Sequence, residues 1–214
     1  MSKPKTKRRY DASGRQARAR ENRERMLDTA RRLFAERGYA ATTLEGIAAE
    51  AGVALPTVYA AFRSKRGLLD GVMRRLIAGE PDAPPLLRTA GARQVLAEPD
   101  PRQLLHRLVE DLSRTQERVM PLYTVLKNAV QAEPDLVEML DGLQRTRLGN
   151  FTAVAKRLAA LGGLRSGLTV EEAGRTLWAI ASPEVRELLT GQAGWTAERY
   201  RGWLADTLAA VLLA

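Results

Sequence analysis

Few residues of this chain are suited to covalent or redox chemistry. The 214-residue sequence contains one histidine, His106, and no cysteine, and it has neither a glycine-rich phosphate loop nor paired carboxylates at catalytic spacing. Without thiols the chain forms no disulfides and no thiolate metal sites, which fits a reducing compartment such as the cytoplasm. We therefore expect a binding function with no cofactor and no metal. The alternative of an enzyme finds no support in these residues.

The positive charge is concentrated in the first third of the chain. Residues 1–75 contain 18 Lys/Arg and 8 Asp/Glu, a net charge of +10, whereas residues 76–214 contain 16 and 17, a net charge of −1. This segregation indicates a polyanionic partner, and double-stranded DNA is the default expectation. A solvated basic tail, a transit peptide and a basic RNA-binding or adaptor protein remain alternatives. No apolar run has the length of a membrane span, so we expect no membrane partner.

The basic first third of the chain is predicted to form a series of short helices. Residues 1–20 lack apolar periodicity and are expected to form a flexible basic arm. The expected helices run from about Glu21 to Gly38 and over about 44–51, 55–62 and 65–79. Thr42 and Thr43 both offer N-cap oxygens for the second helix, and Thr42 precedes Glu45 by three residues, the spacing of a capping box. Two short helices joined by a glycine turn and packed under an amphipathic first helix form a helix-turn-helix unit, which would place the helix over 55–62 in a DNA major groove. A helical bundle without a ligand is the alternative, and the charge distribution argues against it.

The same stretch resembles the TetR family of bacterial repressors. The residues that carry the resemblance are Phe34, Gly38-Tyr39, Thr43-Leu44-Glu45-Gly46-Ile47-Ala48, Ala51-Gly52-Val53, Thr57-Val58-Tyr59, Phe62, Ser64-Lys65 and Leu68-Leu69. The resemblance implies a homodimeric, ligand-responsive repressor that a small, largely apolar effector releases from a palindromic DNA operator. The predicted fold is all-α, with about nine helices, an N-terminal helix-turn-helix domain and a larger helical ligand-binding and dimerisation domain. Its expected parts are an arm (1–20), a DNA-binding domain (21–66, linked by the helix 65–79) and an effector and dimerisation domain (67–214).

The resemblance also assigns residues to DNA contact. Thr43, Tyr59 and Lys65 would hold the phosphate backbone, and Leu55 and Thr57 would face base edges. The full expected set is Thr43, Leu55, Pro56, Thr57, Tyr59, Ala60, Arg63 and Lys65, with Lys7, Arg8 and Arg9 from the arm. The sequence departs from the family pattern at Ala54, Pro56 and Ala60, which removes a capping oxygen and polar base readers. We therefore expect specificity to depend on thymine methyl contacts, Thr57 and DNA shape.

Helical signals continue after a proline-rich segment. Residues 80–101 are expected to form a loop with one helical turn in it. The helices expected beyond it run from Pro101 to just before Pro121 and over about 122–131, 135–161, 169–189 and 196–213. Pro183 should kink the fourth of these, either as a structural bend or as part of a pocket wall.

The last two expected helices carry apolar stripes that would be core in a monomer. By resemblance they would pair with their copies in a second subunit, and two recognition helices would then match a palindrome. The expected dimer interface comprises Leu177, Ile180, Ala181, Leu188, Tyr200, Trp203, Leu204, Leu208 and Val211. Effector-binding candidates are Met120, Tyr123, Asn128, Arg147, Phe151 and Trp178, with Asn150 and His106 as further polar anchors. Each candidate also suits an ordinary core or surface position.

Overall fold

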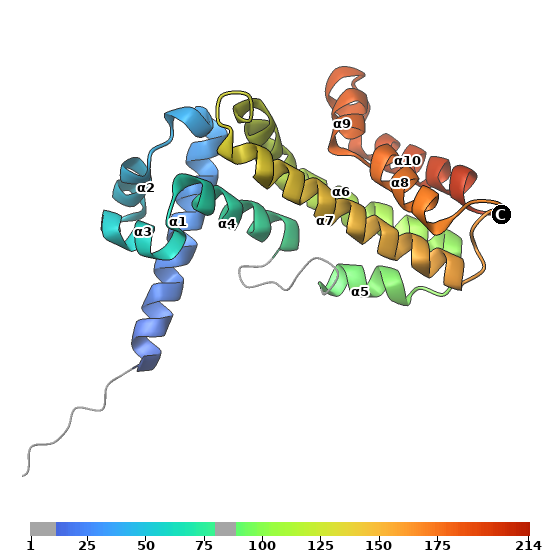
Figure 1. The fold of residues 1–214 in the computed structure, drawn as a ribbon, viewed down its shortest axis with the longest axis horizontal. Helices are drawn as coiled ribbons and strands as arrows, with labels where there is room; N and C mark the ends of the chain where they lie inside the picture. Colours follow the sequence, from blue (N-terminus) through green and yellow to red (C-terminus); the bar gives the residue numbers. More distant parts are fainter. Residues whose placement is uncertain (1–11, 80–88) are drawn as a thin grey trace, which may run out of the picture. The chain divides into compact units, whose positions relative to one another are not determined.

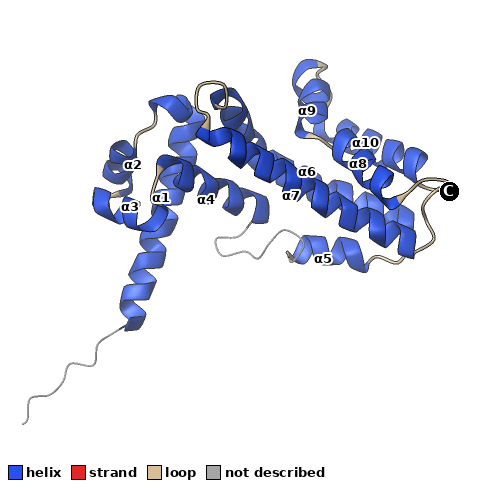
Figure 2. Ribbon diagram, in the orientation of Figure 1, coloured by secondary structure: helices blue, strands red, loops and turns tan. Residues whose placement is uncertain are grey.

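The chain is built from helices (Figures 1 and 2). The computed structural model describes residues 12–79 and 89–214, and over these two ranges no strand forms; an isolated bridge pairs Leu164 with Leu213. The all-α prediction is confirmed. The residues form two compact units, Met1–Val72 and Met73–Ala214, so the boundary falls within helix α4 (Lys65–Ala78) rather than at its start. No helix in the described ranges is long and apolar enough to cross a membrane.

Unit 1 contains α1 (Ala12–Ala41), α2 (Leu44–Ala51), α3 (Leu55–Phe62) and the first turns of α4. Its fully buried side chains come from all four helices and include Met26, Leu33, Phe34, Ile47, Val58, Leu68 and Leu69. Because the apolar residues of α1 recur on one face, burying them against three short helices fixes the position of each short helix. The helix boundaries predicted for α2 and α3 are confirmed.

Helix α1 begins at Ala12, so the prediction of a flexible arm is wrong for residues 12–20. These residues have no apolar face, which is why periodicity did not reveal them. Their Ala, Arg and Gln content nevertheless favours helix, and Arg25 lies 3.8 Å from Glu21 one turn away. The regular helix breaks at Gly38 (φ 78°, ψ 174°), where the sequence predicts an end. In Figure 1 the first turns of α1 extend beyond α2 and α3.

Unit 2 contains the remaining helices. They are α5 (Ala90–Ala97), α6 (Pro101–Ala129), α7 (Asp135–Ala160), α8 (Val170–Ile180), α9 (Pro183–Arg186), a π-helix (Glu187–Gln192) and α10 (Ala197–Leu212). Helix α7 packs against α6 and α8, and α10 packs against the same two helices (Figure 1). The core between them contains Leu104, Leu158, Leu177, Tyr200, Leu204 and Leu208, all fully buried.

Two prolines act differently from the sequence prediction. Pro121 was expected to end a helix, but α6 continues through it because Leu122, Tyr123 and Leu126 beyond it are buried, and this burial outweighs one lost backbone hydrogen bond. Pro183 was expected to kink a helix, but α8 ends at Ile180 and Pro183 occupies the first turn of α9 instead. A proline in a first turn removes no intrahelical bond, since that N–H has no partner there.

Candidate nucleic-acid interface and ligand cavity

Helix α3 is held with one face in the core and the other exposed. Val58 is fully buried and Phe62 is 6% exposed, whereas Tyr59 on the opposite face is 47% exposed. The turn before α3 depends on Gly52 (φ 64°, ψ 39°), a left-handed conformation that glycine adopts without strain, and the Val53 amide donates to the Ala48 carbonyl at 3.0 Å. These contacts present a short helix at a fixed angle, which is what reading a major groove requires.

The two ends of α3 are stabilised unequally. At its start Ala54 offers no capping side chain and Pro56 lies in the first turn, as the sequence indicates. At its end Arg23 of α1 donates from Nη1 to the Ala61 carbonyl at 3.2 Å, and its guanidinium lies 4.4 Å from the centre of the Phe62 ring. A cation at a helix C-terminus interacts favourably with the terminal carbonyls and with the helix dipole. Sequence reasoning missed Arg23 because its partner is 38 residues away.

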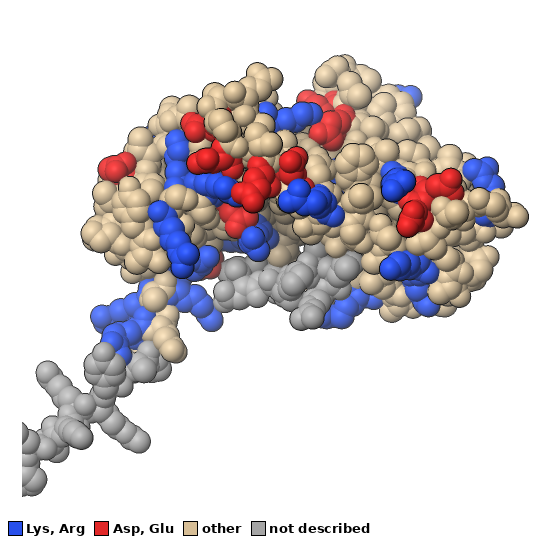
Figure 3. Space-filling view, viewed as in Figure 1, with Lys and Arg blue, Asp and Glu red and all other residues tan. Residues whose placement is uncertain are grey.

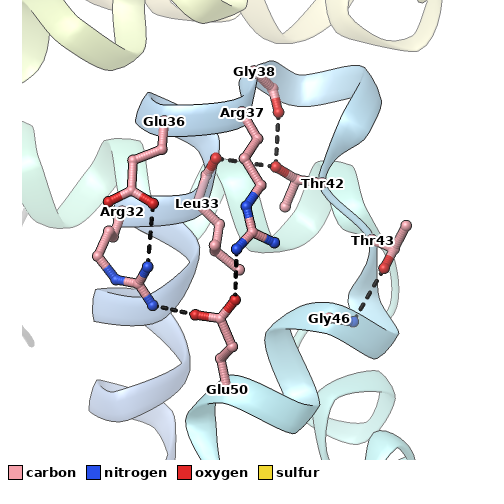
Figure 4. A network of polar contacts seen from close by, with 9 residues as sticks. All are labelled: Arg32, Leu33, Glu36, Arg37, Gly38, Thr42, Thr43, Gly46 and Glu50. Carbon is pink, nitrogen blue, oxygen red and sulfur yellow. Dashed lines mark hydrogen bonds and ion pairs between the residues drawn. The ribbon is translucent and has the colours of Figure 1, made fainter.

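Thr42 and Thr43 have different roles from the capping box predicted at Thr42. Thr43 is the N-cap of α2, and its hydroxyl accepts from the Gly46 amide at 3.0 Å. Thr42 is 1% exposed and donates back to the carbonyls of Gly38 (2.7 Å) and Leu33 (3.2 Å), as Figure 4 shows. The capping box predicted at Thr42 is wrong because the chain turns into α2 one residue later than that box requires. The Thr42 hydroxyl is therefore buried, and the Thr43 hydroxyl lies at the start of α2. Thr43 is therefore at a helix N-terminus, where an anion is favoured.

A carboxylate on α2 joins that helix to α1. Glu50 accepts hydrogen bonds from Arg32 and from Arg37, the latter at 2.9 Å, while Arg32 also pairs with Glu36 at 3.2 Å (Figure 4). The hydrogen bond from Arg32 is the main reason that the pKa of Glu50 is lowered. The cluster is exposed to solvent, so its contribution to stability is small and decreases with salt.

Lys65 is held by α1 in this structure. Its Nζ donates to the carbonyls of Tyr39 (3.0 Å) and Ala40 (3.5 Å) and lies 4.2 Å from the centre of the Tyr39 ring. Of the other predicted DNA contacts, Pro56, Ala60 and Arg63 are exposed with Tyr59, and Leu55 and Thr57 are half-buried. Lys7, Arg8 and Arg9 lie outside the described residues.

Exposed arginines on α1 add to this surface. Arg15, Arg18 and Arg20 are exposed on its first turns, and Figure 3 shows Lys and Arg side chains gathered there. Sequence reasoning placed them in a flexible arm, and their charge was the only signal that could have singled them out. The helix fixes their spacing at 1.5 Å per residue.

Unit 2 contains a cavity of about 70 Å³ with an almost wholly apolar surface. It is lined by Ala92, Val95 and Leu96 of α5, by Leu108, Asp111, Leu112 and Thr115 of α6, and by Arg147, Asn150, Phe151 and Val154 of α7. This volume is well below the roughly 300–1,000 Å³ of pockets that hold drug-sized ligands. Sequence reasoning missed the lining from α5, because the prolines around it predicted a loop.

A chain of polar side chains lies beside the cavity. The Tyr123 hydroxyl donates to Glu184 Oε1 (2.8 Å) and accepts from Gln144 Nε2 (2.8 Å), and Lys127 also donates to Glu184 (3.1 Å). Burial and the neighbouring carboxylate raise the pKa of Tyr123 well above its usual value. Burial opposes the ionisation of Glu184, but its hydrogen bonds outweigh that effect and the pKa of Glu184 is lowered. The network therefore joins α6, α7 and α9 with Glu184 ionised at neutral pH.

Arg147 connects this network to the cavity wall. Its Nη1 donates to Gln144 Oε1 at 3.2 Å and its Nη2 donates to the Trp178 carbonyl, near the end of α8. The guanidinium lies 5.7 Å from the ring centre of Phe151 and 5.1 Å from that of Trp178. Burial lowers the pKa of Arg147, which nonetheless remains a cation at neutral pH.

The predicted effector residues separate into two groups. Arg147, Phe151 and the further anchor Asn150 line the cavity. The others lie away from its wall: Tyr123 is buried in the polar network, Trp178 and Met120 are half-buried, and Asn128 is exposed.

The predicted dimer-interface residues also separate. Leu177, Ala181, Tyr200, Leu204 and Leu208 are fully buried within the single chain, so they belong to its own core rather than to an exposed surface. Sequence periodicity could not distinguish these cases, because core and interface produce the same apolar stripe. Ile180, Trp203 and Val211 are half-buried, and Leu188 is 53% exposed.

A helix-turn-helix unit with one face of its second short helix exposed, followed by a helical unit with a small, partly open cavity, is typical of a DNA-binding regulator. Residues 26–72 match the family model described as bacterial regulatory proteins, tetR family. The chain is 28% identical over 185 residues to the HTH-type transcriptional repressor BepR of Brucella suis biovar 1 (strain 1330), which covers 84% of this chain and 86% of BepR. The tetR family model therefore describes the helix-turn-helix segment of this chain, and the chain as a whole is similar to an HTH-type transcriptional repressor.

Solved structures share the fold. NalD, the secondary repressor of the MexAB-OprM multidrug efflux pump in Pseudomonas aeruginosa, matches with a TM-score of 0.68 at 22% identity, covering 92% of this chain and 98% of NalD. SmeT in complex with triclosan matches with a TM-score of 0.66 at 23% identity, covering 90% and 92% of the two chains.

Proposed function

We propose that this chain is a homodimeric transcriptional repressor that binds a palindromic operator through α3 and is released when a small-molecule effector binds in unit 2. The observation that carries the proposal is the geometry of α3, which buries Val58, exposes Tyr59 and is held at its C-terminal end by Arg23. The relatives support the direction of regulation: BepR is named as a repressor, NalD as a repressor of an efflux pump, and SmeT is solved in complex with triclosan.

The DNA contacts would come from several parts of unit 1. Tyr59 and Thr43 would hold phosphates on either side of the groove, while Thr57 and Leu55 would meet base edges. Lys65 has donors left after its contacts with α1, and Pro56, Ala60 and Arg63 lie on the exposed side of α3. The arginines of the first turns of α1 and the residues Lys7, Arg8 and Arg9 would add sequence-independent phosphate contacts.

The dimer would form through unit 2. Leu188 on the π-helix and the half-buried Ile180, Trp203 and Val211 are the accessible members of the predicted interface. Light scattering on Leu188→Arg tests this, since a buried arginine without a partner should give a monomer. An unchanged dimer would exclude Leu188 from the interface.

Mobility-shift assays on a palindromic duplex selected from a random DNA pool test the DNA-binding part. Thr57→Ala and Tyr59→Ala should weaken binding by about tenfold or more, as expected for contacts worth 1–3 kcal/mol. Val137→Ala, which shortens an exposed side chain of α7, is the matched control and should bind normally. Equal affinity for an RNA duplex at the same salt concentration would contradict the proposal.

A further inference from the structure

We propose that the cavity of unit 2 accepts a compact apolar molecule with one hydrogen-bond acceptor, preferably anionic, and that Arg147 and Asn150 bind this acceptor. The inference rests on the proposed function of unit 2 as an effector-binding unit, and it names the chemical class of the effector.

Two donors at the cavity have no acceptor within residues 12–79 and 89–214. Arg147 Nε and Asn150 Nδ2 are both buried, and neither has a hydrogen-bond partner among these described residues. Both residues line the cavity and lie less than one helical turn apart on α7. Buried donors are nearly always satisfied in folded proteins, so two unsatisfied donors at one cavity indicate an occupant that accepts hydrogen bonds.

The charge at the cavity is positive. Both hydrogen bonds of the Arg147 guanidinium go to uncharged acceptors, an amide oxygen and a backbone carbonyl. Asp111 is the other charged residue of the lining, and its carboxylate packs against the first turn of α5. A Cβ built on Gly91 in that turn would lie 2.1 Å from Asp111 Oδ1. A carboxylate there interacts favourably with the helix N-terminus. Burial lowers the pKa of Arg147 and ionised Glu184 lies close enough to raise it, but no ion pair joins the two side chains among the described residues. A buried cation without a direct ion pair favours an anionic ligand over a neutral one, and both over a cationic one.

The rest of the lining sets the shape of the ligand. Leu108, Phe151 and Val154 supply apolar walls, and a volume of about 70 Å³ is smaller than the roughly 150 Å³ cavity that binds benzene in an engineered protein. A ligand of one ring therefore either displaces lining side chains outward or extends out of the partly open cavity. Its acceptor would at the same time meet Arg147, which also holds the end of α8 through the Trp178 carbonyl.

Three compounds with the same ring test the inference: 4-chlorobenzoate, 4-chlorobenzamide and 4-chlorobenzylamine. Isothermal titration calorimetry on the full-length protein without DNA should show the benzoate binding about tenfold more tightly than the amide, and the amine not binding. Arg147→Met should abolish the preference for the benzoate over the amide. Asn150→Leu should weaken both by about tenfold, whereas Asn128→Leu, at an exposed position away from the cavity, should change neither.

Arg147→Lys provides a second variant in case Arg147→Met unfolds, because it keeps the charge and loses the Nε donor. It should retain the preference for the anion with lower affinity. Binding of the amine as tight as that of the benzoate, wild-type affinity of Asn150→Leu, or binding of none of the three compounds would overturn the inference. Since operator binding is measured separately, a protein that binds the benzoate but no operator would contradict the proposed function and leave this inference standing.

Discussion

Substitution of Gly67 by alanine tests how α4 fixes the end of α3. A Cβ at position 67 would lie 2.1 Å from the carbonyl oxygen of Phe62. In real structures a Cβ atom essentially never lies within 3.0 Å of such a non-bonded atom. The obstacle is backbone rather than a side chain that can rotate away. The start of α4 and the end of α3 must therefore separate by about 0.9 Å.

The expected loss of stability follows from three contributions. Overpacking of this kind costs about 1–3 kcal/mol. The shift also weakens the cap at the start of α4, where the Gly67 amide donates to Ser64 Oγ at 3.0 Å, a bond worth about 1 kcal/mol. Alanine recovers about 0.5–1 kcal/mol through its higher helix propensity. The free energy of unfolding should fall by about 2 kcal/mol.

Gly71→Ala is the matched control, because it lies in the same helix and gains the same propensity. Its Cβ would meet only side-chain atoms, Phe62 Cε1 at 3.1 Å and Leu27 Cδ2 at 3.2 Å, which can move by a few tenths of an ångström. Urea denaturation followed by circular dichroism gives both values, and fluorescence anisotropy should show weaker operator binding for Gly67→Ala alone. Equal stability of the two variants would refute the reasoning.

Three further predictions concern polar contacts. Arg23→Met should lower the free energy of unfolding by about 1 kcal/mol through the lost bond to the end of α3, whereas Arg20→Met, which removes the same charge from an exposed position, should not change it. Thr42→Val should cost about 1 kcal/mol, since it replaces a buried hydroxyl that donates to two carbonyls of α1, and unchanged urea denaturation would show that these bonds add nothing. The lowered pKa of Glu184 means that its contribution is complete above the unfolded value near 4.5 and is lost as pH falls through the folded value. Stability measured against pH should therefore fall less steeply below pH 4.5 in Glu184→Gln, and identical profiles would contradict this.

The sequence predicted local structure well where one physical signal decided it. The boundaries of α2 and α3 and the absence of a cap at Ala54 depend on residues within one turn of each other. The sequence-based prediction failed where one signal is compatible with several outcomes. A proline stops a helix, starts one or is tolerated within it. Burial of the following residues selected the third outcome at Pro121, whereas at Pro183 the preceding helix had already ended at Ile180 and the proline starts the next one.

By itself, the sequence determined the class of fold: an all-α chain whose basic first third carries a helix-turn-helix. These properties follow from composition, periodicity and turn chemistry, which are local and therefore readable in one dimension. Tertiary structure alone decided that Arg23 and Lys65 stabilise helix ends, that Leu204 and Leu208 are core, and that Arg147 and Asn150 meet at one cavity. Each of these depends on contacts between distant residues, and such contacts arise only when the helices pack.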